Sequence, residues 1–389
     1  MNESSASFAS AETGVLAACA LHAVPGVGNA SLHAMQRVFA SLQKAFEAGP
    51  RELLERADDL NLHAATREYL AGSPDLEELG GWALAEARRA DARILLLGDA
   101  RYPQRLAQLD KPPLVLYVRG HLAAEARRVA IVGARHSDEE GLRIARRFGE
   151  QLSQASVQVV SGGARGVDSA AHEGASHGQQ SVAVLGCGVD VVYPPENRSL
   201  FERMAKSGGA VVSEFPPGTQ PRPGNFPRRN RTIAGLSEAV VVVRAALRSG
   251  AMITAEQAVV ARRRVFAVPG QPGNPISAGP DELIRLGVAD PVPTATRVLE
   301  LLDWPVPDEL RGEADKGLPG GPERTDLAAR QSNALRAVGT VSEAGHKLLG
   351  LLHERAPSHV DDLAEKAGLS VSQTLRKLAE LEQKGMCLS

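Results

Sequence analysis

The most constraining feature of the chain is a series of short apolar segments that alternate with helical patterns. The segments are rich in Val, Ile and Leu and show no polar–apolar alternation, which is typical of parallel strands buried on both faces. Helical patterns occupy residues 141–154, 168–177 and 254–263 between them. This succession predicts a doubly wound α/β sheet. The predicted strands are residues 93–97, 114–118, 129–132, 157–160, 182–185, 210–212, 239–243 and 265–268.

The 389 residues are too many for one small core, so we expect several domains. Apolar residues at three- and four-residue spacing predict a small helical domain over residues 1–75, followed by the α/β domain over residues 85–304. Residues 305–341 are rich in Pro, Gly and charge and predict a flexible linker. Residues 342–389 predict three short helices, as in a helix-turn-helix or winged-helix module with almost no wing.

Glycine-rich turns follow four of the predicted strands, at residues 133–135, 161–166, 186–188 and 249–250. Because the carboxyl ends of parallel strands share one edge of a sheet, these turns should gather there, where helix N-termini attract anions. Two of the turns carry an arginine, which favours a phosphate site over turns that are merely tight. Neither G-x-G-x-x-G nor G-x-x-x-x-G-K-[ST] occurs, so we expect no dinucleotide or ATP site and no cofactor.

Positive charge is concentrated locally, although the whole chain has a net charge of −2. Residues 222–264 hold nine arginines against two glutamates. In the FPRRNRTI segment, Pro227 predicts a turn and three arginines flank Asn230, so the segment can present several cations to one polyanion. The arginines at 262–264 follow a predicted helix and favour a solvated face that complements its dipole.

Two other motifs leave alternatives open. The PGVG turn at residues 25–28 resembles a helix-hairpin-helix, which offers backbone N–H groups to a DNA phosphate, but it is also consistent with a purely structural turn. Asp168 and His172 stand four residues apart on a predicted helix and could form an acid–base pair. The competing interpretation is that Asp168 caps the helix and His172 packs nearby.

Cysteine usage and hydropathy favour a cytoplasmic protein without a membrane segment. The three cysteines, Cys19, Cys187 and Cys387, show no metal-ligand spacing and indicate neither a disulfide framework nor a structural zinc site. The N-terminus has no basic region before an apolar stretch, so we expect no signal peptide. No apolar run approaches the ~20 residues needed to span a bilayer.

The motifs together resemble the DprA/Smf family, the DNA-processing proteins of natural transformation in bacteria. The resemblance covers about residues 90–303 and, more loosely, residues 359–370. It is carried by YPQRL (102–106), LVLYVRG (114–120), VAIVGARHSDEEG (129–141), SGGARGVDSAAHEGA (161–175), VAVLGCGVDVVYPPENRSL (182–200), SEFPPG (213–218), NFPRRNRTIAGLSEAVVVVRA (225–245), SGAMITAEQA (249–258), VFAVPGQPG (265–273) and HVDDLAEKAGLS (359–370).

The resemblance implies an extended Rossmann-like domain flanked by an N-terminal helical domain, similar to a SAM or helix-hairpin-helix unit, and a C-terminal winged-helix-like domain. It implies a homodimer, built on the Rossmann-like domain, that binds and protects single-stranded DNA and loads RecA during transformation and recombination. The residues that match the family's DNA contacts are Arg135 and Arg165 in the glycine turns, Gly133, Ser161, Gly162 and Gly166 in the backbone cradle, and Arg228, Arg229 and Arg231 in the FPxRNRxI segment.

The sequence departs from the family pattern at three positions. Arg244 stands where the family usually has Glu, Asp281 where it has Asn, and Arg165 where Lys is common. Arg244 therefore argues against a carboxylate role at that position.

The competing hypothesis is an enzyme, because a related fold occurs in nucleoside-monophosphate phosphoribohydrolases. Their PGGxGTxxE motif supplies a catalytic Glu, and the corresponding stretch here, SGAMITAEQA, offers Glu256 without the paired glycines. A third hypothesis, an interaction hub that acts only through the C-terminal module, leaves the arginine-bearing turns unexplained. Release of ribose phosphate would distinguish the enzyme from a protein that retards DNA without turnover.

Overall fold

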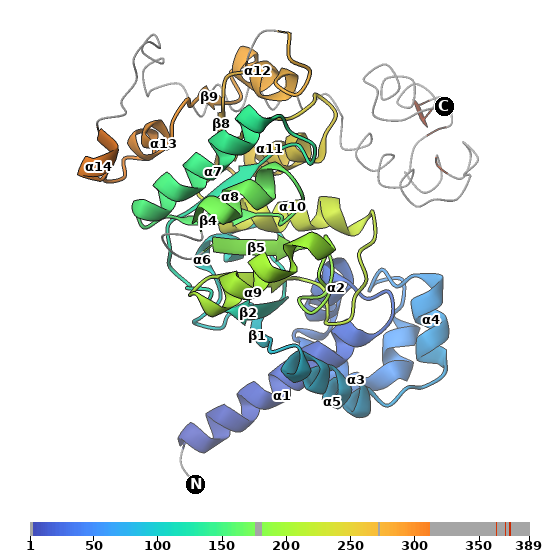
Figure 1. The fold of residues 1–389 in the computed structure, drawn as a ribbon. Coiled ribbons are helices and arrows are strands. Elements are labelled where there is room, and N and C mark those ends of the chain that lie inside the picture. The colour runs from blue at the N-terminus through green and yellow to red at the C-terminus, as the bar shows by residue number, and fades with distance from the viewer. Residues whose placement is uncertain are drawn as a thin grey trace.

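The structure, a computed structural model, describes residues 3–175, 181–270 and 273–311 together with the single residues 363, 370, 373 and 374. Its centre is a sheet that helices surround (Figure 1). The sheet has nine strands in the order β1-β2-β6-β5-β4-β3-β7-β8-β9. The strands are β1 (Arg93–Leu96), β2 (Val115–Gly120), β3 (Arg128–Val132), β4 (Gln158–Ser161), β5 (Ser181–Leu185), β6 (Ala210–Ser213), β7 (Ala239–Val242), β8 (Arg264–Ala267) and β9 (Asp290–Pro291).

The sheet confirms the predicted doubly wound, mostly parallel architecture. In the order of the sheet, the seven strands from β6 through β5, β4, β3, β7 and β8 to β9 all run parallel. Strand β2 is antiparallel to both of its neighbours, β6 and β1. All eight predicted strands are present, and within the described residues the one strand that was not predicted is the two-residue strand β9. The central strands β3 to β7 are buried at every position, which explains why their sequences are continuously apolar.

Helices cover both faces of the sheet. Alternate residues of β3 enter opposite cores: Val129 and Ile131 lie in one, and Ala130 and Val132 in the other. The first core contains α7 (Glu139–Gln154), α8 (Val167–Ala175) and α13 (Ala295–Leu301). The second contains α6 (Gln104–Ala107), α10 (Asn225–Leu236), α11 (Gly250–Val260) and α12 (Ala278–Arg285). Two further helical elements, η1 (Pro195–Asn197) and α9 (Arg198–Lys206), lie between β5 and β6 in the chain.

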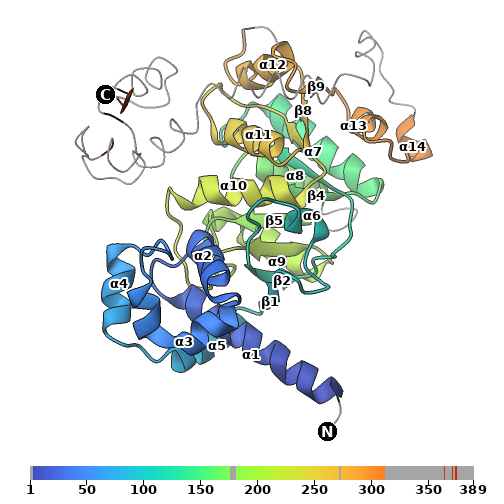
Figure 2. The same ribbon diagram turned by 180° about the vertical axis from the view of Figure 1, so that it is seen from behind.

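The N-terminal helices form a unit that shares its core with the edge of the sheet. They are α1 (Glu3–Ala23), α2 (Asn29–Phe39), α3 (Leu42–Glu55), α4 (Ala64–Ala71) and α5 (Leu76–Arg89). Leu76 and Ala87 of α5 are buried in the same cluster as Leu21 of α1, so we propose that this unit extends to Arg89 rather than to residue 75. Tyr117 and Val189 of the α/β domain belong to that cluster too. Figure 2 shows the unit against the β1–β2 end of the sheet.

The chain continues to pack on the α/β domain beyond residue 304. Trp304 and Val306 contact the core, and Leu310 in α14 (Asp308–Arg311) is buried. We therefore propose that residues 305–311 belong to the α/β domain rather than to the linker predicted from residue 305. The rest of that segment and the helices predicted over residues 342–389 lie, apart from four single residues, outside the described part of the chain. Within the described residues, no helix has the length and apolarity needed to cross a membrane.

The FPRRNRTI segment is not the turn that Pro227 predicted. It forms the first two turns of α10, where a proline is tolerated because the first N–H groups of a helix have no intrahelical partner. Its three arginines therefore point in different directions around the helix and do not form one extended cationic strip.

Candidate nucleic-acid interface

The glycine-rich turns gather at the carboxyl edge of the sheet, as predicted, because β5, β4, β3 and β7 are neighbours. A pocket of about 110 Å³ lies there between the turns that follow β3, β4 and β5. Among the residues that line it are Arg135, Arg165, Tyr193, Phe226 and Arg229. The two arginines that the sequence placed in separate turns thus meet at one site.

Two aromatic rings complete the pocket, and the sequence did not reveal them as site residues. The rings of Phe226 and Tyr193 lie 5.7 Å apart, and Tyr193 is 39% exposed. The guanidinium of the exposed Arg135 lies 5.4 Å from the centre of the Phe226 ring, within the range of a cation–π contact. The two residues belong to the motifs FPRRN and VVYPPEN, in which no sequence pattern distinguishes a site aromatic from a core aromatic.

Arg165 is exposed and forms an ion pair with Glu196. Its Nε and Nη2 atoms donate to Glu196 Oε1 over 2.8 Å and 2.5 Å, and about half of each side chain is exposed. Glu196 belongs to η1, which Asn197 fixes to the SGGARG turn by donating to the Gly163 carbonyl over 2.9 Å and to Ser169 Oγ over 2.8 Å. The buried hydrogen bonds of Asn197 therefore hold the Glu196 backbone close to Arg165, the residue predicted to bind a phosphate.

Arg229 does not occupy the position predicted for a DNA contact. It is 5% exposed, and its Nη1 atom donates to the carbonyl groups of Gly162 and Val184, the latter over 2.6 Å. Burial lowers the pKa of this guanidinium, and the nearby Asp168 opposes that effect. Arg229 forms the floor of the pocket and ties the SGGARG turn to the end of β5.

The two other arginines of α10 do not line the pocket. Arg228 is exposed and lies 5.3 Å from the Phe215 ring. Arg231 is half-buried near Glu214, whose pKa is raised because burial outweighs the opposing effects of Arg228, Thr232 and Arg231. Only the exposed Arg228 could extend the basic surface of the pocket.

Two predicted members of the backbone cradle, Ser161 and Gly162, make hydrogen bonds within the fold. Ser161 is fully buried, and its hydroxyl donates to the Ile131 carbonyl over 2.6 Å, so it does not face DNA in this conformation. The N–H groups of Gly162 and Ala164 donate to Asp168 Oδ2 over 3.1 Å and 3.3 Å. Asp168 therefore closes the glycine turn rather than capping the helix that follows, and these two N–H groups are already in use.

Gly133 and Gly166 let the two arginine-bearing turns pack against each other. A Cβ atom on Gly133 would lie 2.6 Å from Val167 Cγ2 and 2.8 Å from the Arg244 carbonyl oxygen. Gly166 has φ +78°, and a Cβ there would meet the carbonyl oxygens of Ala134 and Arg135. The two glycines thus allow the close packing of the turns from which Arg135 and Arg165 line one pocket.

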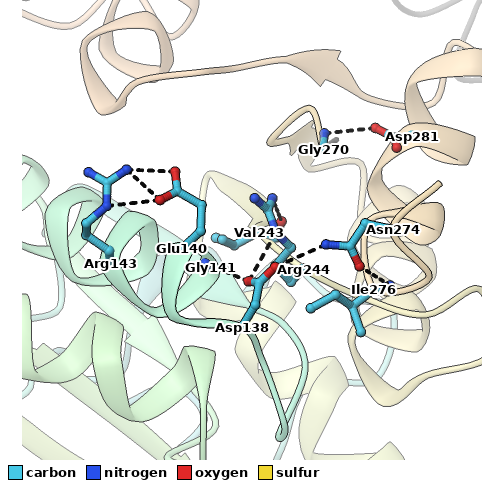
Figure 3. A network of polar contacts seen from close by, with 10 residues as sticks. All are labelled: Asp138, Glu140, Gly141, Arg143, Val243, Arg244, Gly270, Asn274, Ile276 and Asp281. Atoms are coloured by element: carbon cyan, nitrogen blue, oxygen red, sulfur yellow. Dashed lines mark hydrogen bonds and ion pairs between the residues drawn. The ribbon is translucent and has the colours of Figure 1, made fainter. Parts of the chain in front are cut away.

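A polar network fixes the far end of the loop that carries Arg135 (Figure 3). Asp138 caps α7 by accepting from the Gly141 N–H over 2.8 Å, and it also accepts from Asn274 Nδ2 over 3.0 Å. Arg244, only 3% exposed, places its Nε atom 3.6 Å from the same carboxylate and donates to the Val243 carbonyl. Arg244 is therefore a structural partner of Asp138 and lies beneath the surface.

The hairpin turn of residues 25–28 joins the helical unit to the α/β domain. The Asn29 side chain donates to the carbonyl groups of Lys111 and Pro112 and accepts from the Leu114 N–H. Gly28 lies against the guanidinium of Arg228. These contacts favour the structural interpretation of the turn over a direct DNA contact.

The structure also tests the interpretations given to the arginines at 262–264 and to His172. The solvated face predicted for residues 262–264 is wrong for Arg263, which is 5% exposed and donates to the Arg105 carbonyl over 2.7 Å. His172 is fully buried and its Nδ1 atom lies 2.6 Å from Ser181 Oγ, so the packing interpretation is confirmed. Burial lowers its pKa to about 3.

Comparisons with known proteins agree with this architecture. The family model described as DNA recombination-mediator protein A matches residues 93–303, and that of the DprA winged helix domain matches residues 332–389. Protein Smf of Escherichia coli is 39% identical over 298 residues, which cover 75% of this chain and 74% of that protein. Protein Smf of Synechocystis is 32% identical over 380 residues, which cover 93% of this chain and 94% of that protein.

Two solved structures resemble the fold. The structure of DNA processing protein A from Streptococcus pneumoniae superposes with a TM-score of 0.61 at 30% identity and covers 72% of this chain and 95% of that one. The DNA processing protein A from Helicobacter pylori, described for its single-stranded DNA binding mode, has a TM-score of 0.50 at 27% identity over 55% of this chain and 99% of that one. With the two family models and relatives that align over most of their length, the chain belongs to the DprA/Smf family of DNA-processing proteins.

Proposed function

We propose that the carboxyl edge of the sheet binds single-stranded DNA without sequence preference. The observation that carries this proposal is the pocket in which Arg135 and Arg165 flank the rings of Phe226 and Tyr193. Arginines neutralise phosphates, and an aromatic face stacks on a base that is not held in a duplex. The single-stranded DNA binding mode described for the Helicobacter pylori relative supports the same assignment.

The small pocket supports a binding role over catalysis. Pockets that enclose a small-molecule ligand usually measure about 300–1,000 Å³, whereas this one measures about 110 Å³. It suits a single base or phosphate at its rim while the rest of the strand passes outside. We therefore propose a non-enzymatic mediator, and family membership supports its further roles of protecting incoming DNA, loading RecA and forming a homodimer through the Rossmann-like domain.

A binding titration with a fluorescent oligothymidylate tests the site. Arg135→Ala should lower affinity by roughly 1.5–3 kcal/mol, the range for a charge-assisted hydrogen bond, and should flatten the salt slope by about 0.7. Phe226→Ala should lower affinity by about 1–3 kcal/mol through lost stacking. The matched control is Arg51→Ala in α3, which removes another exposed arginine, one that lies far along the chain, and should leave binding unchanged.

Two outcomes would contradict this proposal. The first is equal affinity for a duplex of the same length, since a paired base cannot enter the pocket. The second is release of ribose phosphate from a nucleoside monophosphate, which would establish the competing phosphoribohydrolase activity. Light scattering of the purified protein tests the homodimer, and a strand-exchange assay with RecA tests the loading step.

A further inference from the structure

We propose that Glu196 is a built-in competitor of DNA phosphate for Arg165 and so sets the affinity and salt dependence of the site. This inference rests on the proposed function, because it concerns how a DNA phosphate and the Glu196 carboxylate compete for the same guanidinium at that site. The geometry that points to it is a carboxylate oxygen that already accepts from both Nε and Nη2 of Arg165, the edge a phosphate oxygen would use.

The position of Glu196 is built into the fold. Its neighbour Asn197 is 8% exposed and is bonded to the Gly163 carbonyl and to Ser169 Oγ, so η1 cannot leave the SGGARG turn without breaking buried contacts. The same loop contributes Tyr193 to the pocket. The carboxylate therefore stays beside Arg165 when a strand arrives, and it either shares the guanidinium with a phosphate or is displaced by it.

Glu196 remains ionised wherever the protein would work. A hydrogen bond from its own backbone and the Arg165 side chain hold the pKa of this carboxyl below its usual range. A phosphate that takes Arg165 must therefore leave an unpaired carboxylate, which then attracts a cation from solution. This uptake offsets the counterion that the phosphate releases, so Arg165 should contribute little to the salt slope while Glu196 is present.

Glu196→Gln removes the competing charge and keeps the shape of the side chain. It should raise affinity for oligothymidylate about two- to fivefold, as expected for the loss of an exposed competing ion pair, and steepen the salt slope by about 0.7. The matched control is Glu202→Gln on α9, an exposed glutamate whose substitution makes the same change in net charge. Because exposed charges are screened by salt, the control should change affinity by less than the test variant.

The two substitutions are then repeated in an Arg165→Ala background. Glu196→Gln should lose its advantage there and match Glu202→Gln, since no guanidinium remains to compete for. Weaker binding of the Glu196→Gln variant, or an equal gain in both backgrounds, overturns the inference while leaving the proposed function intact. A parent protein that does not bind the oligonucleotide overturns the proposed function and this inference with it. Unchanged melting temperatures confirm that every variant is folded.

Discussion

Two buried histidines make the stability of this protein depend on pH. Burial, reinforced by Arg229, lowers the pKa of His172 to about 3, and burial, reinforced by Arg228, lowers that of His22 to about 4. In the unfolded chain both groups would titrate near pH 6.5, so below that pH the unfolded state binds protons that the folded state does not. We therefore expect stability to fall from pH 7 to pH 5, by on the order of 1–2 kcal/mol for each histidine.

The contribution of His172 is measured by how steeply the free energy of unfolding depends on pH, and not by the free energy at a single pH. His172→Asn keeps a polar atom for the 2.6 Å contact with Ser181 Oγ but cannot bind a proton, so the free energy of unfolding in urea should depend less on pH. His63 is exposed, and His63→Asn should leave the pH dependence of stability as it is in the parent. An identical slope for the parent and the His172 variant would contradict the argument.

At the scale of elements, the loop that carries Arg135 depends on how α7 begins. Asp138 caps that helix and accepts from Asn274, while the buried Arg244 lies against the same carboxylate (Figure 3). Arg244→Met keeps the volume but removes the charge and the bond to Val243, so it should cost roughly 1–3 kcal/mol of stability. It should also weaken oligonucleotide binding, because the Arg135 loop loses one of its anchors.

Arg143 provides the comparison on the same helix. Its ion pair with Glu140 is exposed, with 62% of the arginine side chain in contact with solvent, so Arg143→Met should change stability by less than ~0.5 kcal/mol. Urea unfolding and the binding titration measure both variants. Equal effects of the two substitutions would show that the buried network does not support the loop.

At the scale of the whole molecule, the helical unit and the sheet should unfold together. Tyr117 and Val189 lie in the same apolar cluster as Leu21 and Leu53 of the helical unit, and Asn29 adds three hydrogen bonds across the junction. The chain has two tryptophans, Trp82 in α5 and Trp304 beside α13, so fluorescence can follow each region separately.

The single-tryptophan variants Trp82→Phe and Trp304→Phe should report the same urea midpoint. Asn29→Ala should lower the midpoint seen by both reporters, since a lost junction hydrogen bond leaves its backbone partners unsatisfied, at a cost of about 1–3 kcal/mol. Two separate transitions, or an Asn29→Ala effect seen only through Trp82, would show that the helical unit folds independently of the sheet.

The elements and their location could be predicted from the sequence because they depend on local chemistry. Continuous Val and Ile runs are stable only as strands covered on both faces, and parallel strands bring their glycine turns to one edge. That was enough to place Arg135 and Arg165 at the same site. The motif resemblance added the family, which the comparisons confirm.

Only the tertiary structure decided which arginines face solvent and what each one contacts. Successive residues of α10 point about 100° apart, so Arg228 is exposed whereas Arg229 is buried beneath the glycine turn, although both belong to one motif. Three of these contacts join segments that are distant in the chain. They are the contact between the Tyr193 and Phe226 rings, the hydrogen bond from Ser161 to the Ile131 carbonyl, and the ion pair of Arg165 with Glu196. Such contacts depend on how loops pack against one another across the edge of the sheet. Local sequence patterns predict helices and strands, but they do not predict which distant loops come into contact.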